Sequence, residues 1–128
     1  MKLVTNNPQY WEFLRNLRND ERVREGFIKQ EYITPERHKE HMMIRGDVFY
    51  ICLIDEQPVG FVRVLNDDIG VCTHPDYQKK GVGKFMINEI MKKYPSAYAK
   101  IKIENKASIG LFESCGFTKK FFLMERDQ

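Results

Sequence analysis

A short polar segment with two glycines, residues 78–83, separates an apolar run that ends near Thr73 from an amphipathic run that begins at Val82. The glycines allow a tight turn and leave backbone N–H groups uncovered, and a helix that starts here points the positive end of its dipole at the turn. Such a turn is suited to hold phosphate. Three lysines add positive charge beside it: Lys79, Lys80 and Lys84. We therefore predict a strand, an anion-binding turn and a helix, in that order.

The length and charge of the chain limit the number of its domains and the kinds of partner that it can bind. At 128 residues we expect one domain, residues 1–128, with a single core. The net charge of +3, from 21 basic and 18 acidic residues, is too small to indicate nucleic-acid binding. No N-terminal segment resembles a signal peptide, and no apolar run approaches the roughly 20 residues that span a bilayer. We therefore expect a cytoplasmic protein that binds neither nucleic acid nor a membrane.

The cysteines and histidines form no ligand-like or catalytic pattern. Three cysteines lie far apart in apolar segments and are expected to be buried free thiols: Cys52, Cys72 and Cys115. His38 and His41 fall on a charged helix, where we expect them to face solvent, and His74 lies in a loop. We therefore predict no metal site and no catalytic histidine.

The N-terminal part of the chain is expected to form one strand and two helices. Residues 2–5 are predicted to be a short strand, and residues 8–17 a helix with its aromatic and leucine side chains on one face. The charged residues that follow, up to Gly26, indicate a solvated helix end and a loop. A second helix is expected over residues 35–45, because Thr34 can cap it and proline suits its first turn.

The rest of the chain alternates between the periods of strands and helices. A short turn signal, Asn66 and Asp67, indicates a tight hairpin between two of the strands. The predicted elements are strands at 48–54, 59–65 and 68–73, a helix at 82–94, a strand at 97–104, a helix at 105–115 and a final strand at 117–124. This order predicts an α/β (α+β) fold, in which a mixed, mostly antiparallel central sheet has helices on both faces.

Two motifs resemble those of the GNAT superfamily of acetyl-CoA-dependent N-acetyltransferases. The acyl-CoA signature of that family is Gln or Arg, two variable residues, Gly, one residue, then Gly or Ala, and residues 78–83 read Gln-Lys-Lys-Gly-Val-Gly. Residues 105–117 are similar to a second family pattern, which begins with Asn-x-x-Ala/Ser and ends with an aromatic residue and Gly-Phe. Order and spacing agree over roughly residues 46–125. The resemblance implies the GNAT fold and acetyl-CoA as the acyl donor.

The resemblance also implies which residues bind acetyl-CoA. A strand backbone would pair with the pantetheine arm, the glycine turn would wrap the pyrophosphate, and the second motif would lie near the arm. The implied cofactor-binding residues are Val71, Cys72, Thr73, Gln78, Lys79, Lys80, Gly81, Val82, Gly83, Lys84, Asn105, Ser108 and Phe112. For Asn105, a plain helix cap is an alternative that does not exclude the ligand contact.

Catalytic roles are implied less directly. Some relatives place a glutamate that deprotonates the amine where this chain has Asp68, so Asp68 is preferred to Asp67 as the general base. Many relatives carry a tyrosine, proposed to protonate the leaving thiolate, at the position of Phe112, and a phenyl ring cannot donate a proton. Tyr98, Ser108, Cys115 or water would then act instead, or the thiolate would leave without a dedicated acid.

The acceptor is the least constrained part of the interpretation. The N-terminal region looks like that of relatives that acetylate amino-sugar nucleotides or ribosomal-protein N-termini, which suggests Arg24, Glu31 or His38 near the acceptor. A small-molecule amine, a peptide N-terminus or a lysine would fit this family. We expect a monomer, or a homodimer in which residues 119–126 pair as strands.

Three functions follow from these observations. The first hypothesis is an N-acetyltransferase that moves acetyl from acetyl-CoA to a primary amine by direct attack in a ternary complex. The second is a non-catalytic acyl-CoA-binding or sensing domain, because Phe112 stands where many relatives have the tyrosine that is proposed to act as the general acid. The third is binding of another anion or nucleotide at the glycine turn. Acyl groups other than acetyl stay open as donors.

Overall fold

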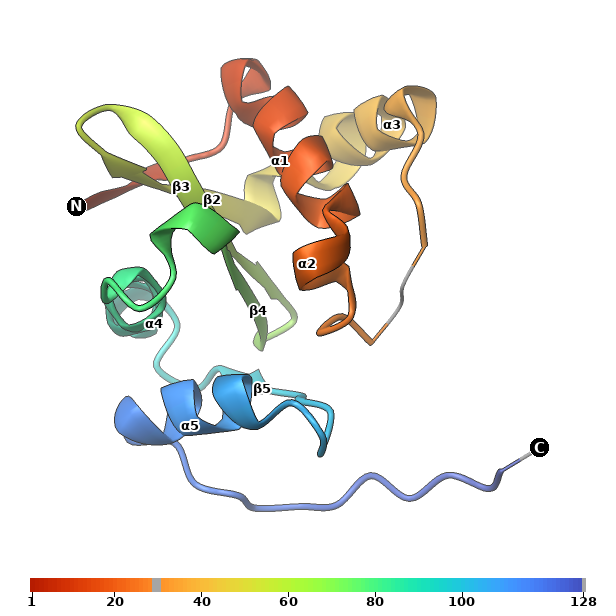
Figure 1. Cartoon of the computed structure of the whole chain (residues 1–128), viewed down its shortest axis with the longest axis vertical. Coiled ribbons are helices and arrows are strands. Elements are labelled where there is room, and N and C mark those ends of the chain that lie inside the picture. The colour runs from red at the N-terminus through yellow and green to blue at the C-terminus, as the bar shows by residue number, and fades with distance from the viewer. Residues whose placement is uncertain (29–30, 128) are drawn as a thin grey trace.

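The computed structural model describes residues 1–28 and 31–127, which form a sheet between two layers of helices (Figure 1). The helices are α1 (Trp11–Asn19), α2 (Glu21–Arg24), α3 (Pro35–Arg45), α4 (Val82–Lys93) and α5 (Lys106–Ser114). Three short 3-10 turns are η1 (Pro8–Tyr10), η2 (Gly46–Val48) and η3 (Pro75–Tyr77). The strands are β1 (Lys2–Thr5), β2 (Phe49–Ile54), β3 (Gln57–Leu65), β4 (Asp68–Thr73) and β5 (Tyr98–Ala99).

The strands are hydrogen-bonded in the order β1-β2-β3-β4-β5. The first three pairings are antiparallel, whereas β4 pairs with β5 in parallel. Two-residue loops join β2 to β3 and β3 to β4, with positive φ at every loop residue, as type I′ hairpins require: Asp55, Glu56, Asn66 and Asp67. The predicted mixed, mostly antiparallel sheet and its Asn66–Asp67 hairpin are therefore confirmed.

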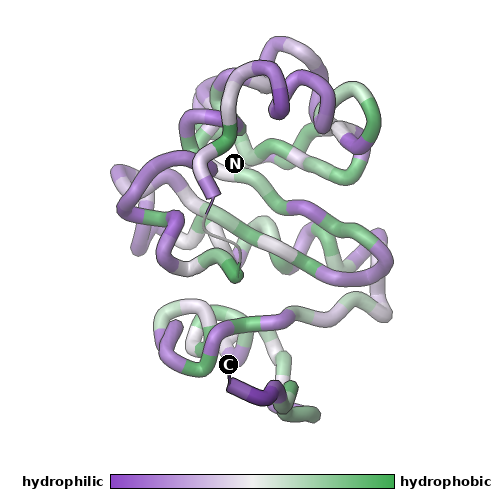
Figure 2. Tube along the Cα trace, turned by 90° about the vertical axis from the view of Figure 1, so that its right-hand side faces the viewer, coloured by the Kyte–Doolittle hydropathy of each residue, from purple (hydrophilic) through white to green (hydrophobic). Residues whose placement is uncertain are grey.

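The two faces of the sheet form two cores. One core packs sheet residues such as Val62 against α4 and α5, and it includes Met86 and Phe112. The other packs Phe49 and Phe61 against α1 and α3. In Figure 2 the apolar colour follows the strands through the middle of the molecule. Helices thus cover both faces, as the sequence predicted.

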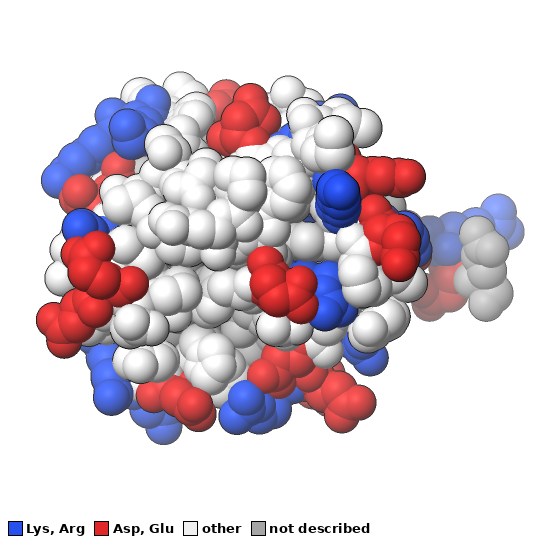
Figure 3. All heavy atoms as spheres, turned by 90° about the horizontal axis from the view of Figure 1, so that it is seen from above, with Lys and Arg blue, Asp and Glu red and all other residues white. Residues whose placement is uncertain are grey.

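Charge is not gathered in one place on the upper face of the molecule (Figure 3). On the face seen from above, acidic and basic side chains are interspersed around an uncharged centre (Figure 3). In the described part of the chain, none of the helices is both long enough and apolar enough to span a bilayer.

The chain after α5 differs from the prediction. Residues 117–127 form no strand, so the final strand expected at 117–124 is wrong. The segment runs away from the helices and the sheet (Figure 1), and four of its apolar side chains are 79% to 94% exposed: Phe121, Phe122, Leu123 and Met124. Such a run is typical of a buried strand, but burial needs a neighbouring edge, and β5 offers only two residues. Pairing of residues 119–126 across a homodimer stays a prediction.

Four shorter predictions also need correction. The strand expected at 97–104 is reduced to Tyr98–Ala99, because it pairs with β4 only at Asp68 and Ile69 before the chain leaves the sheet. A short helix, α2, occupies part of the stretch predicted to be a loop. His38 was expected to face solvent but is only 3% exposed, because the side of α3 that carries it packs against α1. His41, also expected to face solvent, is half-buried. Cys52 and Cys72 are buried as predicted, whereas Cys115 is only half-buried.

Candidate functional site

One edge of β4 is open along most of its length. The strand pairs with β3 from Asp68 to Thr73 but with β5 only at Asp68 and Ile69. Among the described residues, no strand lies along this second edge of β4 after Ile69. Backbone N–H and C=O groups on such an edge can hydrogen-bond an extended ligand as if it were a further strand. The predicted cofactor-binding residues Val71, Cys72 and Thr73 lie on this stretch.

The Cys72 side chain faces the core and not the ligand edge. It is 7% exposed, and burial raises the pKa of its thiol to about 12. A thiol that stays protonated at neutral pH is a poor nucleophile. The Cys72 side chain therefore belongs to the packing of the core, and a contact between its backbone and the cofactor stays a prediction.

The open edge leads into the glycine turn. After η3, the backbone takes positive φ angles of 64° at Lys79 and 80° at Gly81, and α4 then begins at Val82. No side chain caps this helix start, so the N–H groups of its first turn have no partner within the helix. A methyl group placed on Gly81 would meet no atom within 4 Å, which shows that the space above the turn is open. An uncapped helix start beside open space is suited to bind an anion, and anion binding at this turn stays a prediction.

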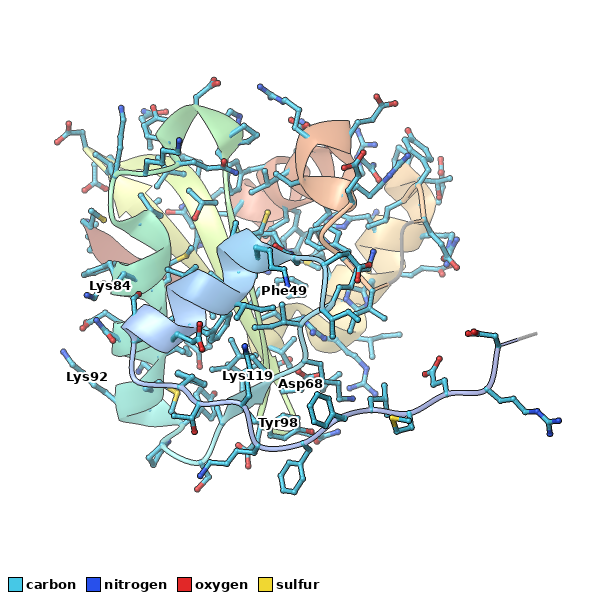
Figure 4. The ribbon with its side chains drawn as sticks, turned by 60° about the horizontal axis from the view of Figure 1, so that its bottom comes forward. Phe49, Asp68, Lys84, Lys92, Tyr98 and Lys119 are labelled. Carbon is cyan, nitrogen blue, oxygen red and sulfur yellow. The ribbon has the colours of Figure 1, made fainter. Side chains whose placement is uncertain are left out.

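The lysines of the turn are exposed. Lys79, Lys80 and Lys84 all lie at the surface, and Lys80 Nζ is 5.4 Å from the centroid of the Tyr77 ring. Figure 4 shows Lys84 and Lys92 projecting from α4 away from the sheet.

The second glycine of the motif has a packing role. Gly83 is buried, and a methyl group on it would lie 2.8 Å from Leu111 Cδ2. The absence of a side chain at residue 83 lets α4 and α5 approach closely. Only the first glycine, Gly81, leaves backbone open to a ligand.

The second sequence motif forms the start and the buried face of α5. Asn105 Oδ1 accepts a hydrogen bond from the backbone N–H of Ser108 at 3.1 Å, which makes Asn105 the helix cap. Phe112 is 4% exposed and packs edge to face on Phe117, with 5.1 Å between ring centroids. Both residues therefore have structural roles, and their contact with the cofactor, like that of Ser108, stays a prediction.

Asp68 lies at the first position of β4, in the part that pairs with β5 and two residues before the open edge begins. Its carboxylate is 4.0 Å from Lys100 Nζ and its side chain is 26% exposed. Asp68 is paired in register with Tyr98, and Figure 4 shows the two residues near one another. Asp67, the alternative base, is exposed in the hairpin loop. Asp68 is thus part of the sheet and partly buried, whereas Asp67 is not, and the role of either acid as a base stays a prediction.

Three residues were predicted to lie near the acceptor: Arg24, Glu31 and His38. Within residues 1–28 and 31–127, no hydrogen bond or ion pair links any of them to another. Arg24 lies on α2, and Glu31 pairs with Arg37 on the surface, 3.6 Å between Oε2 and Nη2. His38 Nε2 is 2.7 Å from the carbonyl oxygen of Trp11, which can only accept, so Nε2 carries the proton. His38 Nδ1 is buried without a hydrogen-bond partner. Burial is the main cause that lowers the pKa of His38, so this side chain is a neutral packing group.

A cluster of two arginines and a histidine around Phe49 was not predicted. Arg18 Cζ lies 5.5 Å from the centroid of the Phe49 ring, and the His41 ring contacts the same ring edge to face at 5.9 Å. Arg63 is directly opposite Phe49 in the sheet. One signal was present in the sequence, because Arg63 is the single charged residue in the apolar run 59–65. Arg63 and Arg18 come to lie on the same face of the sheet only because α1 packs against that face.

A cavity of about 240 Å³ lies next to this region, between α1 and the end of β4. It is lined by Phe13, Asn16, Leu17, Asp20 and His74. Because His74 directly follows β4, this space adjoins the path from the open strand edge to the glycine turn.

Comparison with known proteins agrees with this geometry. The family model for the acetyltransferase (GNAT) family matches residues 11–117. Spermidine N-acetyltransferase from Vibrio cholerae, solved with CoA and spermine, has a TM-score of 0.85 at 19% identity, over 98% of this chain and 85% of that one. A domain from Methanocaldococcus jannaschii has a TM-score of 0.80 at 26% identity, over 93% and 88%. Ribosomal-protein-alanine N-acetyltransferase from Brucella melitensis has a TM-score of 0.76 at 15% identity, over 91% and 83%.

No curated protein sequence matches significantly. The structural likenesses establish the fold, and the family match spans both motifs as well as α1 and α3. The resemblance found in the sequence is therefore confirmed: the chain belongs to the GNAT acetyltransferase family.

Proposed function

We propose that this protein transfers the acetyl group of acetyl-CoA to a primary amine by direct attack in a ternary complex. The main support is the continuity between the open edge of β4 and the uncapped start of α4. An extended thiol arm can pair with the strand beyond Ile69 while its phosphates lie against the first N–H groups of α4. The V. cholerae neighbour was solved with CoA, which agrees with a cofactor of this class.

The proposed reaction needs positioning and proton transfer. The amine nitrogen attacks the thioester carbonyl, a C–N bond forms, the C–S bond breaks, and the products are an amide and the free thiol of CoA. Because a thioester already contains a good leaving group, the protein's main tasks are to align the two substrates and to remove a proton from the amine. Backbone groups of β4 would align the thioester.

Asp68 is the proposed general base. This proposal is supported by the position of Asp68 on β4, two residues before the edge at which the thioester is proposed to lie. The amine arrives mostly as an ammonium ion at neutral pH and must lose a proton before it attacks. Asp68 would accept this proton directly or through a water molecule.

Protonation of the departing thiolate is assigned to no single residue. Phe112 is buried in the core and cannot donate a proton. Tyr98 is 47% exposed and therefore accessible, and Ser108 and Cys115 are half-buried. These three side chains and water are the candidate donors.

The buried Phe112 also supports a second candidate, a domain that binds acyl-CoA without catalysis. One experiment separates the two functions. Purified protein is titrated with acetyl-CoA by calorimetry and is then incubated with acetyl-CoA and a panel of primary amines, while free thiol is measured. Amine-dependent release of CoA with formation of the amide supports the transferase. Tight binding of acetyl-CoA without release across cationic, neutral and anionic amines would instead support the binding domain.

A further inference from the structure

Two arginine side chains, Arg18 and Arg63, lie on the sheet face that α1 and α3 cover. Arg18 lies on α1 over the ring of Phe49. Arg63 lies on β3 in register with Phe49, so both residues leave the sheet on the same face. Arg18 and Arg63 are both half-buried. The two guanidinium groups therefore share one partly dehydrated region.

Neither arginine has a carboxylate partner among the residues that the structure describes. Neighbouring arginines do: Arg15 pairs with Glu12 at 2.5 Å, and Arg22 pairs with Asp20 at 2.8 Å. Holding two like charges together away from water is unfavourable unless an anion compensates them. Arg18 and Arg63 are thus left as an uncompensated pair.

The other ionisable groups around this pair do not neutralise it. Burial is the main cause that lowers the pKa of Arg18, and the charge of Arg63 adds to the effect. Burial also lowers the pKa of His41, followed by the charges of Arg18, His38, Arg45 and Arg63. No carboxylate contributes to either shift. Two acids in this part of the molecule already have basic partners: Asp68 lies 4.0 Å from Lys100 Nζ, and Asp20 pairs with Arg22 at 2.8 Å. The field in this region is therefore positive.

The arginine pair lies beside the place where the two substrates would meet. The guanidinium of Arg63 covers Gly70, since a methyl group there would be 3.2 Å from Arg63 Nη2. Gly70 follows Asp68 by two residues on the same face, and it begins the part of β4 whose edge is open. An acceptor whose amine reaches Asp68 would therefore pass close to Arg63.

We propose that the acceptor is a small amine that also bears a carboxylate or a phosphate group, and that Arg18 and Arg63 bind this anion. The proposal rests on the proposed transferase function and names its substrate class. Guanidinium groups suit the anion because they form paired hydrogen bonds with carboxylate and phosphate oxygens. A polyamine would bring further positive charge to the pair. We therefore expect spermine and spermidine to be poor acceptors here, although spermine is bound in the V. cholerae neighbour.

The test compares amines that differ only in the anionic group. β-Alanine is paired with β-alaninamide, O-phosphoethanolamine with ethanolamine, and spermidine represents polycations. With saturating acetyl-CoA and correction for the fraction of free amine, kcat/KM should be roughly tenfold or more higher for the anionic member of at least one pair. The two pairs also distinguish a carboxylate site from a phosphate site.

Variants connect the preference to the two arginines. Arg18→Gln and Arg63→Gln should each bring the ratio of anionic to neutral kcat/KM toward one. Arg63→Lys should retain part of the ratio, because lysine keeps the charge but loses the paired hydrogen bonds. Arg15→Gln is the matched control on α1 and should keep the wild-type ratio, because Arg15 already pairs with Glu12. Thermal unfolding verifies that each variant is folded.

Measurements of turnover and binding on the wild-type protein alone are enough to test the proposal. Faster turnover of neutral or cationic amines would overturn the anionic acceptor and leave the transferase function intact. Calorimetric titration of CoA-saturated protein with β-alanine and O-phosphoethanolamine covers the remaining cases. Binding without turnover would retain the anion site but overturn the transferase function, and absence of both binding and turnover would overturn the anion site.

Discussion

Gly60 of β3 lies against the backbone carbonyl of Cys72 on β4 so closely that a methyl group on residue 60 would be 2.7 Å from that oxygen. The same methyl group would be 3.1 Å from Met86 Cε on α4. Three elements therefore meet at a position with no side chain. This contact fixes β4 on its β3 side, opposite the edge that we assign to the acyl donor.

Gly60→Ala should destabilise the fold. The new methyl group would press on a backbone oxygen that cannot move without distorting β4, so we expect a loss of about 1–3 kcal/mol in the free energy of unfolding. Gly70→Ala on the neighbouring strand is the control. Its methyl group would meet the end of the Arg63 side chain, which can rotate away, so a change within about 0.5 kcal/mol is expected. Urea unfolding of both variants measures the difference, and equal stabilities would contradict it.

Gly81→Ala should weaken acetyl-CoA binding beyond its effect on stability. The backbone at Gly81 has φ of 80°, which costs a residue with a Cβ about 1–2 kcal/mol. The methyl group would also cover the turn where phosphate is proposed to bind. Gly116→Ala is a matched control, because Gly116 has φ of 90° and equally open surroundings but lies after α5. Both variants should lose similar stability by urea unfolding, whereas only Gly81→Ala should raise the Kd for acetyl-CoA measured by calorimetry.

The parts of the structure that depend on local rules could be predicted from the sequence. The Asn66–Asp67 hairpin forms because those residues tolerate positive φ. Thr34 Oγ1 accepts a hydrogen bond from Arg37 N at 3.2 Å, as expected of a helix cap. The turn at Gly81 and the cap at Asn105 follow the same logic, since each is decided by residues only a few positions apart.

The parts that depend on distant partners could not be predicted. Residues 121–124 have the composition of a strand, but whether they pair depends on an edge elsewhere in the fold. His38 lies on a helix rich in charge, and its burial follows from the way α3 packs on α1. Arg18 and Arg63 belong to different elements, so their proximity is visible only after the fold has formed. For this reason the turn of the proposed donor site could be predicted from the sequence, whereas the arginines of the proposed acceptor site could not.

Lowering the pH from 7.5 to 5.5 should destabilise the protein. Burial lowers the pKa values of His38 and His41 in the fold, whereas both titrate near 6.5 in the unfolded chain. Below about pH 6.5 the unfolded chain therefore binds more protons than the folded protein does. The free energy of unfolding decreases as the pH falls from this value toward the pKa values of the two histidines in the fold. The lowered carboxylate pKa values, such as about 2 for Asp20, act only at more acidic pH.

Urea unfolding at the two pH values measures this effect, and His38→Gln assigns its origin. The glutamine amide can still donate to the carbonyl of Trp11 but cannot titrate. The variant should therefore show a smaller loss of stability between pH 7.5 and 5.5 than the wild type, with the remainder due to His41. Wild-type stability that is equal or higher at pH 5.5 would contradict the buried, neutral state of His38.

Asp68→Asn should remove the proposed general base while keeping the size and shape of the side chain. Because general-base catalysis contributes roughly 10²–10⁴ to the rate, kcat should fall by a factor in that range once an acetylated amine is known. Asp67→Asn is the matched control, since Asp67 is exposed in the adjacent hairpin loop and asparagine tolerates its positive φ. In the wild type, kcat/KM should rise with pH as the amine loses its proton. An Asp68→Asn enzyme with wild-type kcat, under conditions where chemistry limits the rate, would assign proton removal to water instead of Asp68.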